Sequence, residues 1–270
     1  MARKGYASSC FEEDVMSNTP SGKGAALVTG AARRMGRAFI TALAEDGYVP
    51  IVHYNTSSQE ADALVSEFRK DGIEAVAIGA DLADPGAAQG LIGQAREKAG
   101  PLRVLVNSAS IFEDDSSQTL TADSFRRHMD VNTLAPALLS REFAKQAEAG
   151  SMIFNVLDYK LFNINADFFS YTLSKAALEA MTQMHAREFA PTVRVNAVAP
   201  GLTLPSPYHS REEFERLHDD NPLKRGPTLE DMVRTLRYFL ATPSVSGQIL
   251  AVDGGQHFDP RLTRDVFGAL

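Results

Sequence analysis

The segment "AALVTGAARRMG" (residues 25–36) decides the fold. Its first half is a short apolar run ending in Gly30, which is typical of a buried strand, and helical spacing follows from residue 34. A glycine-rich turn between a first strand and a first helix lets the backbone approach a pyrophosphate at the helix N-terminus. Ala32 stands where the usual G-x-G-x-x-G spacing has its middle glycine. On this motif alone, an ordinary strand–helix turn remains the alternative.

Downstream of this turn, apolar runs alternate with amphipathic stretches. We expect strands at 25–30, 48–54, 73–82, 102–110, 151–158, 193–201 and 247–255. We expect helices at 34–46, 57–72, 84–100, 121–148, 168–190 and 228–241. Continuous apolar strands separated by helices indicate a parallel sheet covered on both faces. The sequence therefore predicts an α/β fold with a Rossmann-type, doubly wound, parallel seven-stranded sheet and helices on both faces, in a single domain.

Composition limits the class of protein. The 270 residues carry a formal charge of −7 and no basic block, which argues against nucleic acid as a partner. No apolar run approaches the ~20 residues of a membrane span, so we expect no membrane partner, and we identify no metal site. One cysteine, Cys10, in a polar leader fits a cytoplasmic protein. We expect residues 1–23 to be a flexible extension and residues 24–270 to form the domain.

The end of the second expected strand indicates which dinucleotide would bind. An Asp or Glu here usually holds the ribose 2′-hydroxyl of NAD, but residues 53–59 contain no carboxylate. They offer hydrogen-bond donors, and Arg33 and Arg34 lie in the adjacent turn. A 2′-phosphate requires donors and cations, so we expect NADP(H) rather than NAD(H). The alternative is that the two arginines only solubilise the loop.

Two further strand ends reach the sheet edge at which ligands bind in open α/β folds. Asp81 could contact a ligand there or cap the next helix, for which Asp84 is equally suited. The small residues of "NSA" (107–109) let the backbone lie close to a cofactor or form a tight turn.

The stretch "FFSYTLSKAALEAM" (168–181) reads as a helix that carries Tyr171 and Lys175 on one face. Neither side chain belongs on a buried face without a partner. A phenol beside an ammonium has a lowered pKa and can donate a proton near neutral pH. Chance is the alternative explanation, because Tyr-x-x-x-Lys is a short pattern.

With these motifs in order, the chain resembles the short-chain dehydrogenase/reductase family over about residues 24–258. The matching motifs are TGxxxxxG (29–36), "NSAS" (107–110), Asn132 in "DVN", Tyr171-x-x-x-Lys175 and "PG" (200–201). The resemblance implies that Tyr171 is the general acid and that Lys175 lowers its pKa and holds the nicotinamide ribose. It also implies that Asn132 keeps a water in a proton relay, and that the catalytic domain forms a homotetramer through helices that include the Tyr171 helix.

The strand ends and the resemblance together give a set of expected cofactor contacts. They are Gly30, Arg33, Arg34, Met35, Gly36, His53, Tyr54, Asn55, Thr56, Ser57, Asp81, Leu82, Asn107, Ser108, Ala109, Tyr171, Lys175, Pro200, Gly201 and Thr203.

One position departs from most of the family. Most members have a serine thirteen residues before the tyrosine, where this chain has Asp158. A serine would hydrogen-bond a ketone oxygen, whereas an ionised aspartate would repel an oxyanion. Protonated, or bonded through water to a ring nitrogen, Asp158 suits the reduction of a C=N bond, in which the product nitrogen must gain a proton. It could alternatively cap a helix or pair with Lys160.

In further stretches the chain is similar to the pteridine-reductase-like branch, including dihydromonapterin and dihydrofolate reductases. "TGAARRMG", "HYNTSS", "NSASIF", "LDY" (157–159) and "VDGGQHF" carry this similarity. It implies NADPH-dependent reduction of a dihydromonapterin-, dihydrobiopterin- or dihydrofolate-type pterin under a lid at about 202–227. The implied substrate contacts are Arg34, Ser110, Phe112, Asp158 and Tyr171.

Three alternatives remain open at this point. Phe112 could simply pack its own loop. The chain could be a carbonyl reductase of another ketone, such as a 3-oxoacyl thioester, which Asp158 disfavours. It could also be a non-catalytic NADPH-binding protein, which would have no need of the Tyr171–Lys175 pair.

Overall fold

The computed structural model describes residues 22–206, 208 and 210–259. Its parallel sheet has seven strands in the order β3-β2-β1-β4-β5-β6-β7. The strands are β1 (Ala25–Val28), β2 (Val49–Tyr54), β3 (Val76–Gly79), β4 (Leu102–Asn107), β5 (Ser151–Val156), β6 (Val193–Pro200) and β7 (Ile249–Val252). This confirms the predicted α/β class and strand number. The strand order reverses between β1 and β4, and the crevice at this switch point is where such sheets bind ligands.

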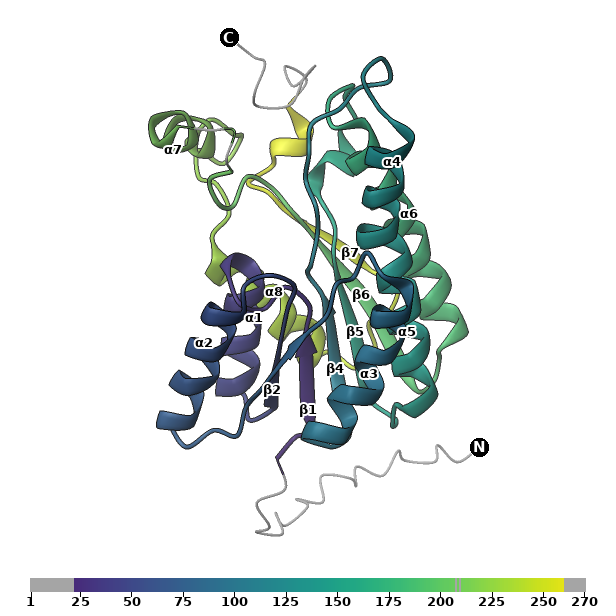
Figure 1. Ribbon diagram of the computed structural model, residues 1–270. Helices are drawn as coiled ribbons and strands as arrows, with labels where there is room; N and C mark the ends of the chain where they lie inside the picture. Colours follow the sequence, from purple (N-terminus) through teal and green to yellow (C-terminus); the bar gives the residue numbers. More distant parts are fainter. Residues whose placement is uncertain (1–21, 207, 209, 260–270) are drawn as a thin grey trace, which may run out of the picture.

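Helices cover both faces of the sheet (Figure 1). One layer consists of α1 (Arg34–Glu45), α2 (Ser58–Lys70) and α8 (Leu229–Ala241). The other consists of α3 (Pro85–Ala99), α4 (Ala122–Met129), α5 (Ala135–Gln146) and α6 (Phe169–Glu188). Three short helical turns, η1 (Asp130–Leu134), η2 (Tyr159–Phe162) and η3 (Gln256–Phe258), and the helix α7 (Arg211–Asp219) complete the described elements.

Strand β5 shows why both faces are covered. All six of its residues are buried, and successive side chains of a strand point to opposite faces. Phe154 belongs to the core under α1, where its ring meets Phe39 edge-on at 5.6 Å. Ile153, one residue earlier, belongs to the core under α5 with Leu139. A strand that is buried along its whole length thus supplies two cores at once, as a buried parallel sheet requires.

Each expected strand is longer than the observed one, and one expected helix is interrupted. The strand expected at 73–82 is only β3, because its partner β2 ends at Tyr54, opposite Gly79. The helix expected at 121–148 is interrupted by η1, a π-helical turn that contains Asn132. Such wide turns inside helices occur frequently at functional sites.

The segment at 202–227 contains a helix that the sequence prediction missed. Ser210 and Glu213 form a reciprocal capping box at the start of α7, a pattern that is readable as a helix start. Most of the expected N-terminal extension lies outside the described residues. None of the helices in the described part of the chain is long and apolar enough to cross a membrane.

Candidate active site

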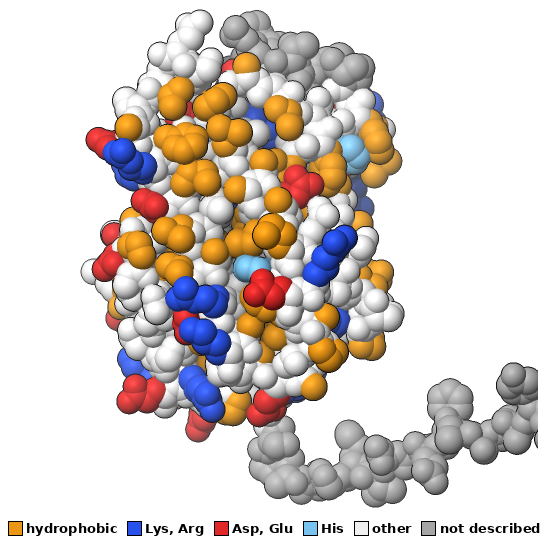
Figure 2. All heavy atoms as spheres, turned by 90° about the vertical axis from the view of Figure 1, so that its right-hand side faces the viewer, with side chains coloured by type: hydrophobic (Ala, Val, Ile, Leu, Met, Phe, Trp, Pro, Cys, Tyr) orange, Lys and Arg blue, Asp and Glu red, His pale blue; other side chains and the backbone are white. Residues whose placement is uncertain are grey.

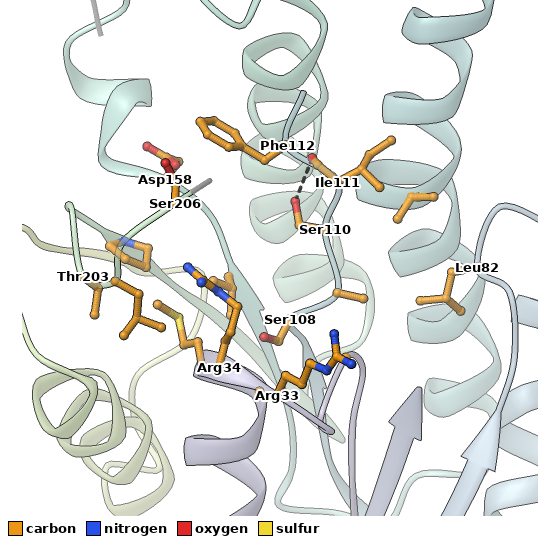
Figure 3. Close-up of a pocket in the computed structure, with 18 of the residues that line it drawn as sticks. Arg33, Arg34, Leu82, Ser108, Ser110, Ile111, Phe112, Asp158, Thr203 and Ser206 are labelled. Atoms are coloured by element: carbon orange, nitrogen blue, oxygen red, sulfur yellow. Dashed lines mark hydrogen bonds between the residues drawn. The ribbon is translucent and has the colours of Figure 1, made fainter. Parts of the chain in front are cut away.

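A cavity of about 520 Å³ opens at the carboxyl end of the sheet and takes its walls from many separate segments. All the predicted cofactor and substrate contacts line this cavity, including Arg33 and Arg34, with the exception of Asn107. Arg34 lies between Thr203 and Ser108, while Arg33 extends on the side of Leu82 (Figure 3). Asp158, Phe112 and Ser206 mark the opposite end of the same view (Figure 3).

The glycine turn is shaped by close backbone approaches. Gly30 has φ +67°, a conformation that L side chains rarely adopt. A Cβ on Gly36 would lie 2.3 Å from the Gly30 carbonyl oxygen, so α1 can pack on the turn only with glycine there. Arg34, the first residue of α1, also has a positive φ of 54°. A non-glycine residue in this conformation is strained and is held at functional sites where its side chain is needed.

His53 supports this turn from β2. Its Nδ1 accepts a hydrogen bond from the Gly30 backbone N at 3.0 Å, and its Nε2 lies 3.1 Å from the Ala80 carbonyl oxygen. Because a carbonyl can only accept, the proton is on Nε2. Burial lowers the pKa of His53 to about 4, so the ring is neutral at pH 7. His53 therefore joins the turn after β1 to the end of β3.

The edge expected to hold a 2′-phosphate carries donors and one ion pair. Asn55, Thr56 and Ser57 line the cavity, and Arg33 is paired with Glu60 in the first turn of α2. Ser57 and Glu60 have the sequence spacing of a capping box. Ser57 is the N-cap residue, but within the described structure its side chain makes no capping bond, and the Glu60 carboxylate pairs with Arg33.

Asp81 and Asp84 take different roles: Asp84 caps the next helix, and Asp81 lies at the edge of the cavity. The Asp84 carboxylate accepts a hydrogen bond from Gly86 N at 2.8 Å and caps α3. The Asp81 carboxylate faces the cavity edge, where it accepts from Ala83 N at 3.0 Å and from Asn55 Nδ2 at 3.4 Å.

Tyr171 and Asp158 meet directly. The Tyr171 hydroxyl donates to Asp158 Oδ2 at 2.7 Å, and Asp158 Oδ1 accepts from Lys160 N at 2.9 Å. Asp158 therefore caps η2, as one alternative proposed, and also contacts the phenol. The residue that departs from the serine of most family members thus shares a hydrogen bond with the expected proton donor.

Lys175 lies one helical turn after Tyr171 and is fully buried in the wall of the cavity. Its Nζ donates to the Val156 carbonyl oxygen at 2.8 Å and lies 5.7 Å from the centre of the Tyr171 ring. Burial lowers the pKa of Lys175 to about 8, although the charge of Asp158 opposes this shift. The ammonium form still predominates at pH 7.

Asn132 does not line the cavity but fixes its wall. Its Oδ1 accepts from Ile111 N at 2.9 Å and from Ser110 Oγ at 3.1 Å. Its Nδ2 donates to the Ile111 carbonyl and to Ser174 Oγ, both at 3.0 Å. The amide is thus saturated by protein atoms and clamps the loop after β4 to α6. A relay water, as the resemblance implies, would need a partner other than this side chain.

Asn107 lies behind the wall rather than on it. Its Nδ2 donates to Asn155 Oδ1 at 2.8 Å in the buried interior. Nine lining residues were missed by the sequence analysis, because they are apolar or lie beside a recognised motif: Ala32, Ile111, Val131, Val156, Leu157, Tyr159, Leu202, Leu204 and Ser206. Tyr159 stood within the quoted "LDY" motif, and its hydroxyl accepts from Gln256 Nε2 at 3.1 Å.

Aromatic rings gather at the end of the cavity that holds Asp158 and Tyr171. Phe112 is stacked on Phe168 with centroids 4.1 Å apart and an interplanar angle of 7°. The Phe112 ring also meets Tyr171 edge-on at 4.7 Å and Tyr208 edge-on at 6.0 Å. Phe112 therefore packs against its surroundings and lines the cavity as well, which joins the two roles considered for it.

A glycine turn at the switch point of a parallel sheet, with a buried Tyr–Lys pair beside it, defines a dinucleotide-dependent oxidoreductase. A family model described as Enoyl-(Acyl carrier protein) reductase matches residues 30–257. A short-chain type dehydrogenase/reductase of Picea abies is 32% identical, over 86% of this chain and 91% of that protein. A 3-oxoacyl-[acyl-carrier-protein] reductase of Synechocystis is 31% identical, over 85% of this chain and 95% of that protein.

A solved structure is more similar in sequence than these relatives. FolM alternative dihydrofolate reductase 1 from Brucella canis, complexed with NADP, superposes with a TM-score of 0.85 at 39% identity. The match covers 88% of this chain and 95% of that one. The chain belongs to the short-chain dehydrogenase/reductase family, as its motifs predicted, and is an oxidoreductase.

Proposed function

We propose that this protein is an NADPH-dependent reductase of a pterin of the dihydromonapterin, dihydrobiopterin or dihydrofolate type. The hydrogen bond between Tyr171 Oη and Asp158 Oδ2, at 2.7 Å, carries this proposal. It places a carboxyl group where most of the family has a serine, directly beside the proton donor. The FolM relative, an alternative dihydrofolate reductase crystallised with NADP, supports both the substrate class and the cofactor.

The lining residues fit NADP(H). The turn at Gly30 exposes backbone at the N-terminus of α1, where a pyrophosphate binds favourably. Arg33 and the side chains of Asn55, Thr56 and Ser57 would hold the 2′-phosphate, since residues 53–59 present no carboxylate to repel it. Lys175 would hold the nicotinamide ribose. The bound cofactor supplies a hydride, and the remaining chemistry falls to this chain's own side chains.

In the proposed reaction, the substrate C=N bond becomes CH–NH. The carbon receives the hydride and the nitrogen receives a proton from Tyr171 Oη, directly or through Asp158 in its protonated form. The Lys175 ammonium, buried close to the Tyr171 ring, stabilises the phenolate that remains. A proton from solvent then restores Tyr171. Asp158 can both accept from the phenol and face the substrate's N–H groups.

The aromatic end of the cavity suits a flat substrate. Stacking on Phe168 fixes the plane of the Phe112 ring, so an incoming heteroaromatic ring meets a preset apolar wall. Arg34 projects into the same cavity between Ser108 and Thr203 (Figure 3). Its strained backbone supports a role in contacting cofactor phosphates and substrate together. We further propose that residues 202–227, including α7, form the lid over this end.

The test is NADPH oxidation, followed by absorbance, with 7,8-dihydromonapterin, 7,8-dihydrobiopterin and 7,8-dihydrofolate. A 3-oxoacyl thioester serves as the ketone control. Turnover of a dihydropterin, faster with NADPH than with NADH, is expected. Tight NADPH binding without turnover of any dihydropterin would contradict the proposal.

A carbonyl reductase is the second candidate, and the 3-oxoacyl-[acyl-carrier-protein] reductase relative favours it. Against it, Asp158 would repel the oxyanion that a reduced ketone develops. Turnover of the 3-oxoacyl thioester alone would establish this second function. Turnover of any substrate would exclude a purely cofactor-binding role.

We also propose a cytoplasmic homotetramer. Apolar side chains are spread over the face of the molecule that carries α4, α5 and α6 (Figure 2). Leu134, Leu173 and Met184 are among the exposed apolar residues of η1 and α6, and covering such a face with a second copy would remove it from water. Light scattering would then give four times the chain mass of 29.3 kDa.

A further inference from the structure

We propose that Asp115 is a positioning residue. It fixes the orientation of Tyr171, the proposed proton donor, together with that of Phe112 in the wall of the substrate site. Asp115 lies in the loop between β4 and α4, outside the cavity lining and 55 residues from its main partner, Ser170. This inference rests on the proposed role of Tyr171 as proton donor, and it does not depend on which substrate is reduced.

The Asp115 side chain caps the catalytic helix. Its Oδ1 accepts from the Ser170 backbone N at 2.8 Å, and its Oδ2 accepts from the hydroxyls of Ser170 and Ser124. Its own backbone carbonyl accepts from Phe169 N at 3.0 Å. The first N–H groups of a helix need such partners. The local N-cap residue of α6 is Phe168, which has no side-chain oxygen to offer, so a distant carboxylate fills this role.

Charge and burial fit the same role. Asp115 is only 6% exposed. Burial alone would raise its pKa, but the hydrogen bonds from Ser170 and Ser124 outweigh burial and hold the pKa below its usual value. An ionised carboxylate therefore faces the positive end of the α6 dipole, where an anion stabilises a helix.

The cap lies where it can orient both the Tyr171 phenol and the Phe112 wall of the substrate site. Tyr171 follows Ser170 directly, so the capped turn sets the direction from which the phenol reaches Asp158. Three residues before Asp115, Phe112 is stacked on Phe168 at 4.1 Å. The stack and the cap thus clamp segments 112–115 and 168–171 to each other at two points.

The backbone of Phe168 shows how firmly this clamp is determined. Phe168 has φ +53° and ψ +51°, a left-handed conformation that is uncommon for a residue other than glycine. Such strain persists only where the surroundings over-determine it. Here the ring stack fixes the side chain of Phe168, and Asp115 fixes the two peptide groups that follow.

The experiment compares Asp115→Asn and Asp115→Ala with Asp114→Asn, a matched control at the exposed neighbouring acid. Steady-state NADPH oxidation with 7,8-dihydrofolate gives kcat, fluorescence titration gives the Kd for NADPH, and hydrogen exchange reports residues 111–113 and 169–172. Positioning errors of this kind cost roughly 10- to 100-fold in rate. We expect kcat of Asp115→Ala to fall by about that factor while the NADPH Kd changes less than about threefold. Asp115→Asn keeps one acceptor for Ser170 N and should lie between Asp115→Ala and the wild type.

Exchange should accelerate in both segments of the Asp115 variants and in neither segment of Asp114→Asn. The inference is overturned if Asp115→Ala keeps wild-type kcat and exchange, or if only residues 169–172 loosen. It is also overturned if kcat and NADPH affinity fall together, as general destabilisation would produce. Where Asp115→Ala does not fold, Ser170→Ala removes one hydrogen bond and should shift kcat and exchange in the same direction. If the wild type reduces none of the three dihydropterins, the proposed function fails, whereas exchange still decides the clamp.

Discussion

The two ends of the cavity are built by different means. At the cofactor end, the geometry comes from backbone: Gly30 and Gly36 allow close approach at the end of β1, and His53 ties that turn to β3. At the proposed substrate end, the geometry comes from side chains of loops and of α6, with Asp158 against Tyr171. The fold itself therefore provides the dinucleotide site, whereas a few replaceable side chains determine the chemistry performed beside it.

The largest expected effect comes from a substitution at the substrate end that lowers kcat and leaves NADPH binding at the cofactor end unchanged. Tyr171→Phe removes the proposed proton donor while keeping the ring against Phe112. General acid catalysis is worth about 10²–10⁴-fold in rate, so kcat should fall by that factor, and the NADPH Kd should change little. Stopped-flow single turnovers and a fluorescence titration measure the two quantities. A kcat within tenfold of the wild type would remove Tyr171 from its assigned role.

The next effect concerns the cofactor end and its pH dependence. His53 has a pKa of about 4 in the folded protein because it is buried, against about 6.5 when unfolded. The unfolded chain therefore binds the proton first, and stability falls as the pH drops from 6.5 to 4. The loss from this group is about 3 kcal/mol, since one pKa unit corresponds to about 1.4 kcal/mol.

Urea unfolding at pH 7, 5 and 4 measures this loss. His53→Gln can accept from Gly30 N and donate to the Ala80 carbonyl without titrating. The variant therefore separates the contribution of His53 to the pH dependence of stability from that of the carboxyl groups. The pH dependence should be shallower in this variant. Parallel curves for His53→Gln and the wild type would show that His53 is not held neutral.

A smaller effect tests how the cofactor end distinguishes NADPH from NADH. Arg33→Gln should weaken NADPH binding by up to about tenfold, because a hydrogen bond to a charged group is worth about 1.5–3 kcal/mol and the exposure of Arg33 reduces this value. NADH binding should hardly change. Glu60→Gln releases Arg33 from its ion pair and is the matched control, which should leave NADPH binding unchanged or tighter. Equal losses for both dinucleotides would place Arg33 away from the 2′-phosphate.

Much of the cofactor end could be predicted from sequence because its signals are local. The spacing of Gly30 and Gly36 is a backbone requirement, and strand periodicity gave the sheet class. The Tyr171–Lys175 pair was readable for a similar reason, because residues four apart in a helix share one face.

The remaining features depend on tertiary contacts that no local pattern carries. Asn132 in the π-helical turn hydrogen-bonds the 110–111 loop and α6, and both partners are distant in sequence. The Arg33–Glu60 pair joins the residue before α1 to the first turn of α2, across 27 residues of sequence. Asp115 caps a helix that begins 54 residues later, a contact that depends on how the loop after β4 folds back onto α6.

The most direct test of the substrate end is to restore the family's usual residue with Asp158→Ser. The quantity to measure is the ratio of kcat/KM for a 7,8-dihydropterin to kcat/KM for a 3-oxoacyl thioester, in both proteins with NADPH. We expect the wild type to favour the dihydropterin and Asp158→Ser to lower the ratio by about 100-fold or more, the range of one acid–base group. An unchanged ratio, with both proteins folded and binding NADPH equally, would contradict the assignment of Asp158 as the residue that selects C=N over C=O reduction.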